Sequence, residues 1–192
     1  MGSGLPLPAY IAAAPVQLRP FAATDAAAVA HFCGDADLAL MTGLIPHPYL
    51  PGMAEGWIAS HAAARRHGTA YVWAITLTDA AAIIGSIELR PAHDAVDSIG
   101  YWLGRPHRGR GYMTAALRAV IDAGFAHLAG DEWHATHLVR NPASGRVMAR
   151  CGMSWWRNER RLHRGHDEEF AVRGITRGEW QRLAGTRPRA GG

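Results

Sequence analysis

Hydrophobic and polar residues alternate along the chain with two periods, which predict a mixture of strands and helices. A period of two predicts strands at 16–21, 71–78, 82–90, 98–103, 133–139, 155–162 and 169–175. Apolar residues three and four positions apart predict helices at 26–33, 53–66, 112–129 and 143–151. Glycines at 34, 68 and 152 follow three of these helices, as is typical of helix C-termini.

The connections between these segments indicate how the strands pair. A short turn near Asp79 predicts an antiparallel hairpin from strands 71–78 and 82–90, and Gly165 lies at the turn of a second pair, 155–162 with 169–175. Strand 16–21 is interpreted as an edge strand that ends at Pro20. Residues 43–52 contain three prolines and two glycines, so they are expected to form a loop.

The central segment has the order strand, glycine-rich turn, helix, strand. If strands 98–103 and 133–139 are neighbours in one sheet, they must pair in parallel through a right-handed crossover. The fold class is therefore α/β (α+β), a mixed, mostly antiparallel sheet with one parallel βαβ crossover and helices on both faces. We expect a single domain at 16–182, a flexible N-terminal segment at 1–15 and a disordered tail at 183–192.

The composition is that of a folded domain outside the membrane. Of 192 residues, 48% are hydrophobic and 19% are charged, which suffices for a core. No apolar run reaches the ~18 residues of a membrane span, and the first 15 residues lack the basic residues of a signal peptide. Two cysteines far apart in sequence exclude a disulfide framework, so we expect a cytoplasmic protein.

The basic residues are unusual in kind and in position. All 20 are arginine, which excludes a Schiff-base lysine and a P-loop lysine. Residues 1–89 contain 3 arginines and 6 acidic residues, whereas residues 90–192 contain 17 and 10. An arginine-rich half favours a partner with phosphates, either a nucleotide cofactor or nucleic acid, and a solvated basic surface is the alternative. Nucleic acid is disfavoured because no binding module with interleaved aromatic and basic residues is found.

A glycine turn lies immediately before the long central helix and contains Gly109 and Gly111 between arginines. The first N–H groups of a helix have no internal partner and lie at the positive end of its dipole. Glycines let a ligand approach the backbone closely, so the turn predicts a phosphate or pyrophosphate site, although a plain tight turn has the same pattern. The dinucleotide fingerprint does not fit, because Thr114 stands where its third glycine is required.

Four stretches in a fixed order resemble the GCN5-related N-acetyltransferases (GNAT family), and within them the Rim-type ribosomal-protein N-terminal acetyltransferases. The stretches are the strand 99–104 (IGYWLG), the loop 108–114 (RGRGYMT), residues 141–153 (NPAS…M..CGM) and the ending 176–180 (TRGEW). The similarity extends from about Val16 to Trp180. It implies a single GNAT-type domain that binds acetyl-CoA and uses no metal.

The resemblance also implies a cofactor site between strands 98–103 and 133–139, where the two splay apart. The main chain of Trp102 and Leu103 is then expected to pair with the pantetheine arm. Asn141 is expected to hold that arm, with Ser144 close to the sulfur. The loop residues assigned to the cofactor are Arg108, Gly109, Arg110, Gly111, Tyr112, Met113 and Thr114.

Two positions depart from the family pattern, and they bear on catalysis. Met113 replaces the usual small residue of the loop, and Met148 stands where many members have a tyrosine that protonates the leaving thiolate. Ser144 is therefore our candidate acid, with an ordinary first-turn hydrogen bond to the backbone as the alternative. Glu88 is our candidate base, because it interrupts an apolar strand, where burial tends to raise the pKa of a carboxyl group; a solvent-facing glutamate is the alternative.

Together these features predict an N-acetyltransferase that transfers acetyl from acetyl-CoA directly to a primary amine in a ternary complex. The acceptor is a protein N-terminus or a small amine, and the loop 43–52 is expected to form one wall of its site. An inactive acyl-CoA-binding protein of the same fold is the alternative, supported by Met148. The histidines 134, 137, 163 and 166 do not have the arrangement of a metal site. The acceptor and the oligomeric state, including a homodimer, stay open.

Overall fold

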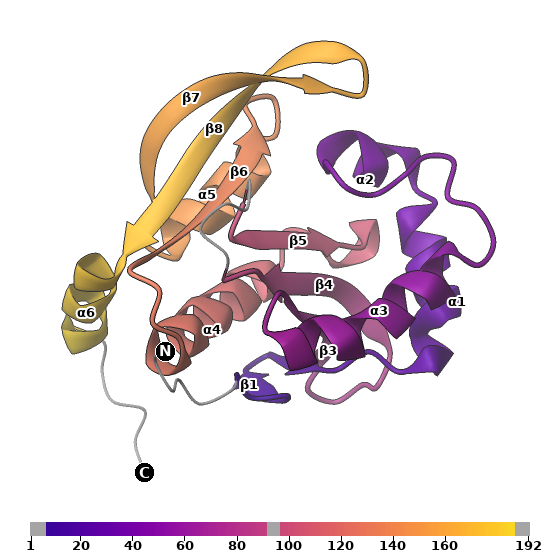
Figure 1. The fold of residues 1–192 in the computed structure, drawn as a ribbon, viewed down its shortest axis with the longest axis horizontal. Helices are drawn as coiled ribbons and strands as arrows, with labels where there is room; N and C mark the ends of the chain where they lie inside the picture. The colour runs from indigo at the N-terminus through magenta and orange to yellow at the C-terminus, as the bar shows by residue number, and fades with distance from the viewer. Residues whose placement is uncertain (1–6, 92–96, 187–192) are drawn as a thin grey trace.

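The computed structural model describes residues 7–91 and 97–186, which form two antiparallel sheets and six α-helices (Figure 1). The first sheet has the strand order β1-β2-β3-β4-β5, and the second has the order β6-β8-β7. The strands are β1 (Ile11–Ala13), β2 (Val16–Arg19), β3 (Tyr71–Leu77), β4 (Ile83–Leu89), β5 (Ile99–Leu103), β6 (Glu132–Leu138), β7 (Ser154–His163) and β8 (His166–Thr176). The helices are α1 (Ala26–Cys33), α2 (Ala36–Met41), α3 (Met53–His67), α4 (Tyr112–His127), α5 (Pro142–Arg150) and α6 (Arg177–Thr186), with 3-10 turns at Ala23–Asp25 and Arg105–His107.

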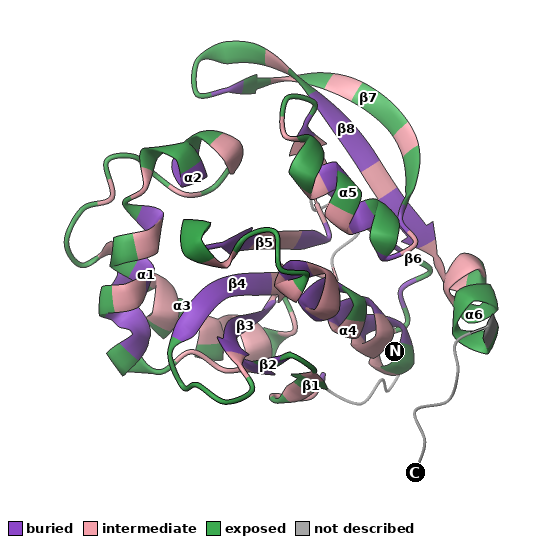
Figure 2. Ribbon diagram, turned by 180° about the vertical axis from the view of Figure 1, so that it is seen from behind, coloured by how far each residue is buried: buried purple, intermediate pink, exposed green. Residues whose placement is uncertain are grey.

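Helices cover both faces of the five-stranded sheet, as predicted. Helix α4 packs on the face that we call the rear, where Leu117, Val120 and Ile121 join Trp73 and Ile87 in the main core. Helices α1 and α3 cover the opposite, front face around a second apolar cluster that includes Val29, Ala74 and Trp102. The view from behind shows the buried strands β3 and β4 at the centre of this arrangement (Figure 2). Period-two alternation assigns neighbouring strand residues to opposite clusters.

Most elements lie where the sequence predicts them, and two of the differences lie at the ends of the domain. Strand β2 is not an edge strand, because Ile11–Ala13 pairs with it as β1. The flexible segment expected at 1–15 is therefore wrong for residues 7–15, where Leu7 is also only 3% exposed. At the other end, α6 continues to Thr186, beyond the predicted boundary at 182. Residues 1–6 and 187–192 lie outside the described part of the chain.

The predicted parallel pairing between the strands around α4 is the main correction to the topology. The crossover β5-α4-β6 exists, but β5 is an edge of the first sheet and β6 is an edge of the second. They meet where the Ser98 amide donates a hydrogen bond to the His134 carbonyl at 3.0 Å. Beyond that point they belong to separate sheets, as the resemblance implied. Figure 1 shows the two sheets diverging from this junction.

Among residues 7–91 and 97–186, no helix combines the length and hydropathy that a membrane span requires.

Candidate active site

The loop Arg108–Thr114 lies at the N-terminus of α4, and we call it the phosphate loop. Its glycines have left-handed backbones, with φ of 77° at Gly109 and 81° at Gly111. An added Cβ at either position would meet no atom within 4 Å, so the backbone is open to a ligand. The Ala115 amide donates to the Gly111 carbonyl, which leaves the amides of residues 112–114 ahead of the helical hydrogen-bond pattern. This geometry fits a pyrophosphate group.

The register of β5 determines which main-chain groups face the gap between the sheets. Hydrogen bonds join Arg90 to Ser98 and Gly104 to Ile84, so the main chain of even-numbered β5 residues is directed toward β4. Trp102 follows this pattern, because a Cβ on Gly85 would lie 2.4 Å from its carbonyl oxygen. The main chain of Tyr101 and Leu103 faces away from β4. The expectation for Leu103 is thus compatible with the fold, whereas the main chain of Trp102 is directed toward β4 and that of Tyr101 is not.

Arg108 connects the phosphate loop to the edge of β5 that faces away from β4. Its Nε donates to the Leu103 carbonyl oxygen at 3.0 Å. Of the other loop residues, Met113 is buried in the main core, Tyr112 and Thr114 are half-buried, and Arg110 is exposed. The long Met113 side chain thus packs inward, away from the loop's open surface.

A hydrogen bond between side chains connects β5 to α5. The Tyr101 hydroxyl lies 2.8 Å from Ser144 Oγ and 3.3 Å from the Ser144 carbonyl oxygen. The N-cap of α5 is Asn141, whose Oδ1 accepts from the Ser144 amide at 3.4 Å, so Ser144 is not the capping residue. The partner of the Ser144 hydroxyl is thus Tyr101 rather than a free backbone N–H, and its role in catalysis stays a prediction. Burial raises the pKa of Tyr101. Met148 is buried in the core and offers no acid.

Glu88 lies on the front face of β4, opposite Ile87 and Leu89, which point into the rear core. Its register partner on β5 is Gly100, and a Cβ there would lie 2.8 Å from Glu88 Oε1. The glycine therefore makes room for the carboxylate beside the middle of β5. The side chain is 21% exposed and forms an ion pair with Arg90. Burial raises the pKa of Glu88, although Arg90 opposes this shift.

Further charged side chains lie near Glu88, and no sequence motif identifies them. We call the set the front charged group; it comprises Glu88, Arg90, Asp97, Glu159 and Arg161. Each of these side chains is about a quarter exposed, between 21% and 26%. Charged residues two positions apart at 159 and 161 share one face of the predicted strand 155–162, and this is the signal that could have found the last two.

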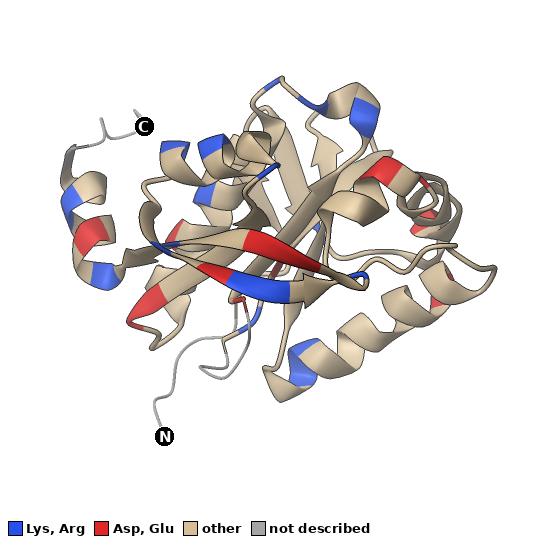
Figure 3. Cartoon of the chain, turned by 90° about the horizontal axis from the view of Figure 1, so that it is seen from above, with Lys and Arg blue, Asp and Glu red and all other residues tan. Residues whose placement is uncertain are grey.

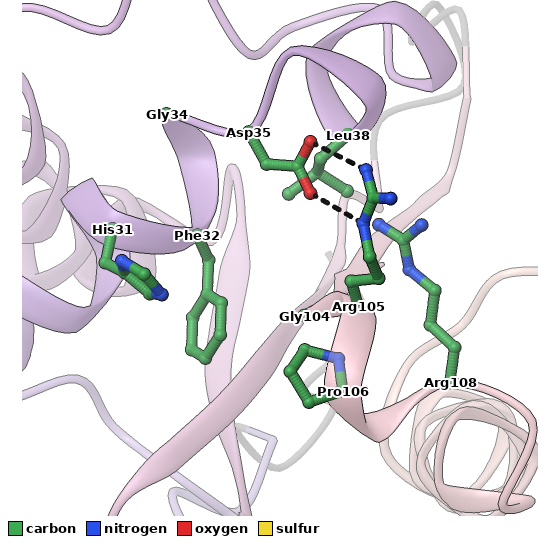
Figure 4. A pocket seen from close by; sticks show the side chains of 9 residues that line it. All are labelled: His31, Phe32, Gly34, Asp35, Leu38, Gly104, Arg105, Pro106 and Arg108. Atoms are coloured by element: carbon green, nitrogen blue, oxygen red, sulfur yellow. Dashed lines mark hydrogen bonds and ion pairs between the residues drawn. The ribbon is translucent and has the colours of Figure 1, made fainter.

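A pocket of about 350 Å³ lies beside the end of β5, between α1, α2 and the beginning of the phosphate loop (Figure 4). Phe32 and Leu38 form its apolar wall, and Arg105 crosses it to form ion pairs with Asp35 and Asp37. The Phe32 ring packs against the backbone of Gly104, where a Cβ would lie 2.5 Å away. The short helix α2, which the sequence did not reveal, therefore lines this pocket through Leu38.

The tip of the β7–β8 hairpin contacts α2 and the loop after it, and we call this contact the clasp. Arg164 Nε donates to the Ala39 carbonyl at 3.0 Å, and the same side chain bonds to the Ile45 carbonyl. His163 Nε2 lies 3.2 Å from the Leu40 carbonyl. The hairpin thus reaches the loop 43–52, which the sequence predicted as an acceptor wall. Figure 1 shows its tip bending toward α2.

Much of the arginine-rich half is used inside the protein. Figure 3 shows basic and acidic segments side by side along the β7–β8 hairpin, where Arg160 pairs with Asp167 and Arg161 with Glu159. Arg177 donates to three backbone carbonyls near the end of α4. These three arginines therefore have partners within the protein. In the described residues, no group of three potential metal ligands is found.

Comparison with known proteins establishes the class. The acetyltransferase (GNAT) domain model matches residues 16–154, and the chain belongs to this family. The probable N-acetyltransferase YjcK of Bacillus subtilis is 41% identical over 54 residues, which are 28% of this chain. The match spans only 30% of the length of that curated relative.

Two solved structures have the same fold across nearly the whole chain. The microcin C7 self-immunity acetyltransferase MccE, in complex with acetyl-CoA and AMP, has a TM-score of 0.74 and 16% identity, covering 92% of this chain and 97% of that one. RimL, a ribosomal alpha-N-protein acetyltransferase in complex with coenzyme A, has a TM-score of 0.76 and 16% identity, covering 87% and 97%.

Proposed function

We propose that this protein transfers an acetyl group from acetyl-CoA to a primary amine within a ternary complex. One observation carries the proposal: Glu88 lies on the front of β5, over Gly100, while Tyr101 and Ser144 lie on its rear side. A base and a proton donor thus flank the gap between the sheets, and the phosphate loop lies at its mouth. Direct transfer needs a base on the side where the amine arrives and a donor where sulfur leaves.

In the proposed reaction, the carboxylate of Glu88 takes one proton from the acceptor's ammonium, directly or through water. The nitrogen lone pair then forms a bond to the carbonyl carbon of the thioester, and the carbon–sulfur bond breaks. The nitrogen gives up its second proton to water, and the sulfur leaves with the bonding electrons and receives a proton. The products are an N-acetyl amide and coenzyme A.

Ser144 is the proposed donor to the departing sulfur, because Met148 cannot supply a proton. Its hydroxyl is held by Tyr101, which can return the proton that Ser144 gives up, with water completing the exchange. A hydrogen bond to a charged group contributes about 1.5–3 kcal/mol. This pair is a weaker acid than an ordinary tyrosine in water, because burial raises the pKa of Tyr101.

The acceptor class follows from the front of the site and from the relatives. The front charged group suits a basic amine, and RimL acts on protein N-termini by its name. The test is incubation with acetyl-CoA and a panel of alkyl amines and peptides with free N-termini, with free thiol and product mass as readouts. Thiol release with an acetylated product supports the proposal. Acetyl-CoA binding without turnover of any amine would favour the acyl-CoA-binding alternative.

A further inference from the structure

Asp97 has one satisfied and one unsatisfied carboxylate oxygen. Its Oδ2 accepts a hydrogen bond from Thr136 Oγ1 on β6 at 2.9 Å. Its Oδ1 is buried and has no hydrogen-bond partner in the part of the chain that the structure describes. A buried polar atom left in this way costs about 1–3 kcal/mol, and more when it is charged. Such an atom calls for an explanation, and a ligand that donates a hydrogen bond is one.

The contacts of Asp97 and Ser98 place Asp97 at the junction of the two sheets. The adjacent Ser98 is tied to His134 twice, through the backbone bond at 3.0 Å and through Ser98 Oγ and His134 Nδ1, also at 3.0 Å. The Asp97 carboxylate therefore lies at the closed end of the gap between the sheets. Glu88 lies further along the same strand pair, opposite Gly100. An acceptor that reaches Glu88 from the front would come close to Asp97.

Asp97 forms one long ion pair, with Arg161, and is attracted from further away by Arg90 and His134. Arg161 Nη1 is 4.0 Å from Oδ2, but its guanidinium pairs with Glu159 and lies over the Phe170 ring. Arg90 forms its ion pair with Glu88. Burial raises the pKa of Asp97, and the negative charge of Asp97 also raises the pKa of Glu88. A cation bound between the two carboxylates would offset both effects.

We propose that Asp97 is a substrate-binding residue whose Oδ1 accepts a hydrogen bond from the acceptor's ammonium group. This inference rests on the proposed acetyl transfer and narrows its acceptor to amines that arrive protonated. The ammonium offers three N–H groups, so one can bond to Asp97 while another gives its proton to Glu88. Asp97 then holds the acceptor nitrogen in place while the loss of a proton to Glu88 frees the lone pair of that nitrogen.

The test compares an amine with an analogue that lacks only the amine. The pairs are benzylamine with benzyl alcohol, and an alanyl tripeptide with its lactyl counterpart. The amine that the unmodified protein acetylates faster is the probe. Asp97→Asn keeps the shape and removes the charge. It should raise the KM of the amine about 10- to 100-fold, the loss of one charged hydrogen bond. The inhibition constant of the alcohol analogue and the affinity for acetyl-CoA should change less than twofold.

Two further variants complete the experiment. Asp167→Asn, on the exposed hairpin tip, is the matched control and should leave the KM unchanged. Thr136→Val keeps the charge of Asp97 but removes the hydrogen bond that orients its carboxylate, so the KM of the amine should rise by a smaller factor. If Asp97→Asn has a much lower melting temperature than the wild type, Thr136→Val replaces it in the test. An unchanged amine KM, or equal weakening of amine and alcohol, would overturn the role of Asp97. Failure of the unmodified protein to acetylate any amine would instead overturn the proposed function itself.

Discussion

The mouth and the front side of the gap between β5 and β6 present different chemical groups to a ligand. At its mouth, the phosphate loop presents backbone, with two left-handed glycines and the first amides of α4. On the front side, the site presents side chains, namely carboxylates and arginines from β4, the start of β5 and β7. In the proposed reaction, the backbone amides bind the group that is common to every reaction cycle, whereas the side chains select the acceptor and take up its proton.

The largest effect is expected at the mouth. Asparagine and aspartate both tolerate a left-handed backbone, so Gly111→Asn and Gly111→Asp differ only in charge. Aspartate places a negative charge at the proposed pyrophosphate site, where like-charge repulsion of about 3 kcal/mol corresponds to roughly 10²-fold weaker acetyl-CoA binding. The asparagine variant should lose far less affinity. Calorimetry on both variants makes the comparison, and equal affinities would place the phosphate elsewhere.

The next largest effect is expected at Glu88. Glu88→Gln should lower kcat/KM by about 10²-fold near neutral pH, because the proton acceptor is lost. The base acts only when ionised, and burial raises its pKa. The wild-type rate should therefore fall as the pH drops through a value above that of an ordinary glutamate. The variant should lack this acid limb. Glu55→Gln, on the exposed part of α3, serves as the control, and identical pH profiles would make Glu88 a structural residue.

A smaller effect is expected on the rear side of β5. Ser144→Ala should lower kcat about tenfold, as the leaving sulfur loses a hydrogen bond, with a melting temperature close to wild type because Asn141 caps α5. Tyr101→Phe should have a weaker effect of the same kind. Both defects should shrink with an acyl thioester whose thiol is more acidic. If both variants turn over normally with acetyl-CoA and with the more acidic thioester, solvent water is the proton source.

The smallest effect is expected at the clasp. Arg164 has φ 51°, so Arg164→Asn keeps a residue that tolerates the left-handed backbone while removing the guanidinium. The contacts with Ala39 and Ile45 are then lost. The acceptor KM should rise a few-fold, and amide exchange should quicken at the hairpin tip and in α2, while acetyl-CoA affinity stays constant. Arg160→Asn, whose partner is Asp167, is the control. Unchanged exchange in both segments would show that the clasp is not what holds them.

Some parts of this protein could be predicted from the sequence because they depend on local patterns. Alternation places Ile87 and Leu89 in the rear core and Glu88 on the front, and the apolar stripe of α4 faces the sheet. The glycines at 109 and 111 indicate the phosphate loop, because few other residues allow that backbone so close to a helix start. Each of these features depends only on residues that are close to one another in the sequence.

Other parts were decided only by the tertiary structure, because they join residues far apart in sequence. No local pattern pairs Tyr101 with Ser144, Asp97 with Thr136 or Arg164 with α2. Nor does any local pattern reveal that β5 and β6 separate after one hydrogen bond, since each strand alone looks like a member of one sheet. Period-two alternation reports which face a side chain occupies, but only the pairing partner determines where the main chain of Tyr101 and Trp102 points.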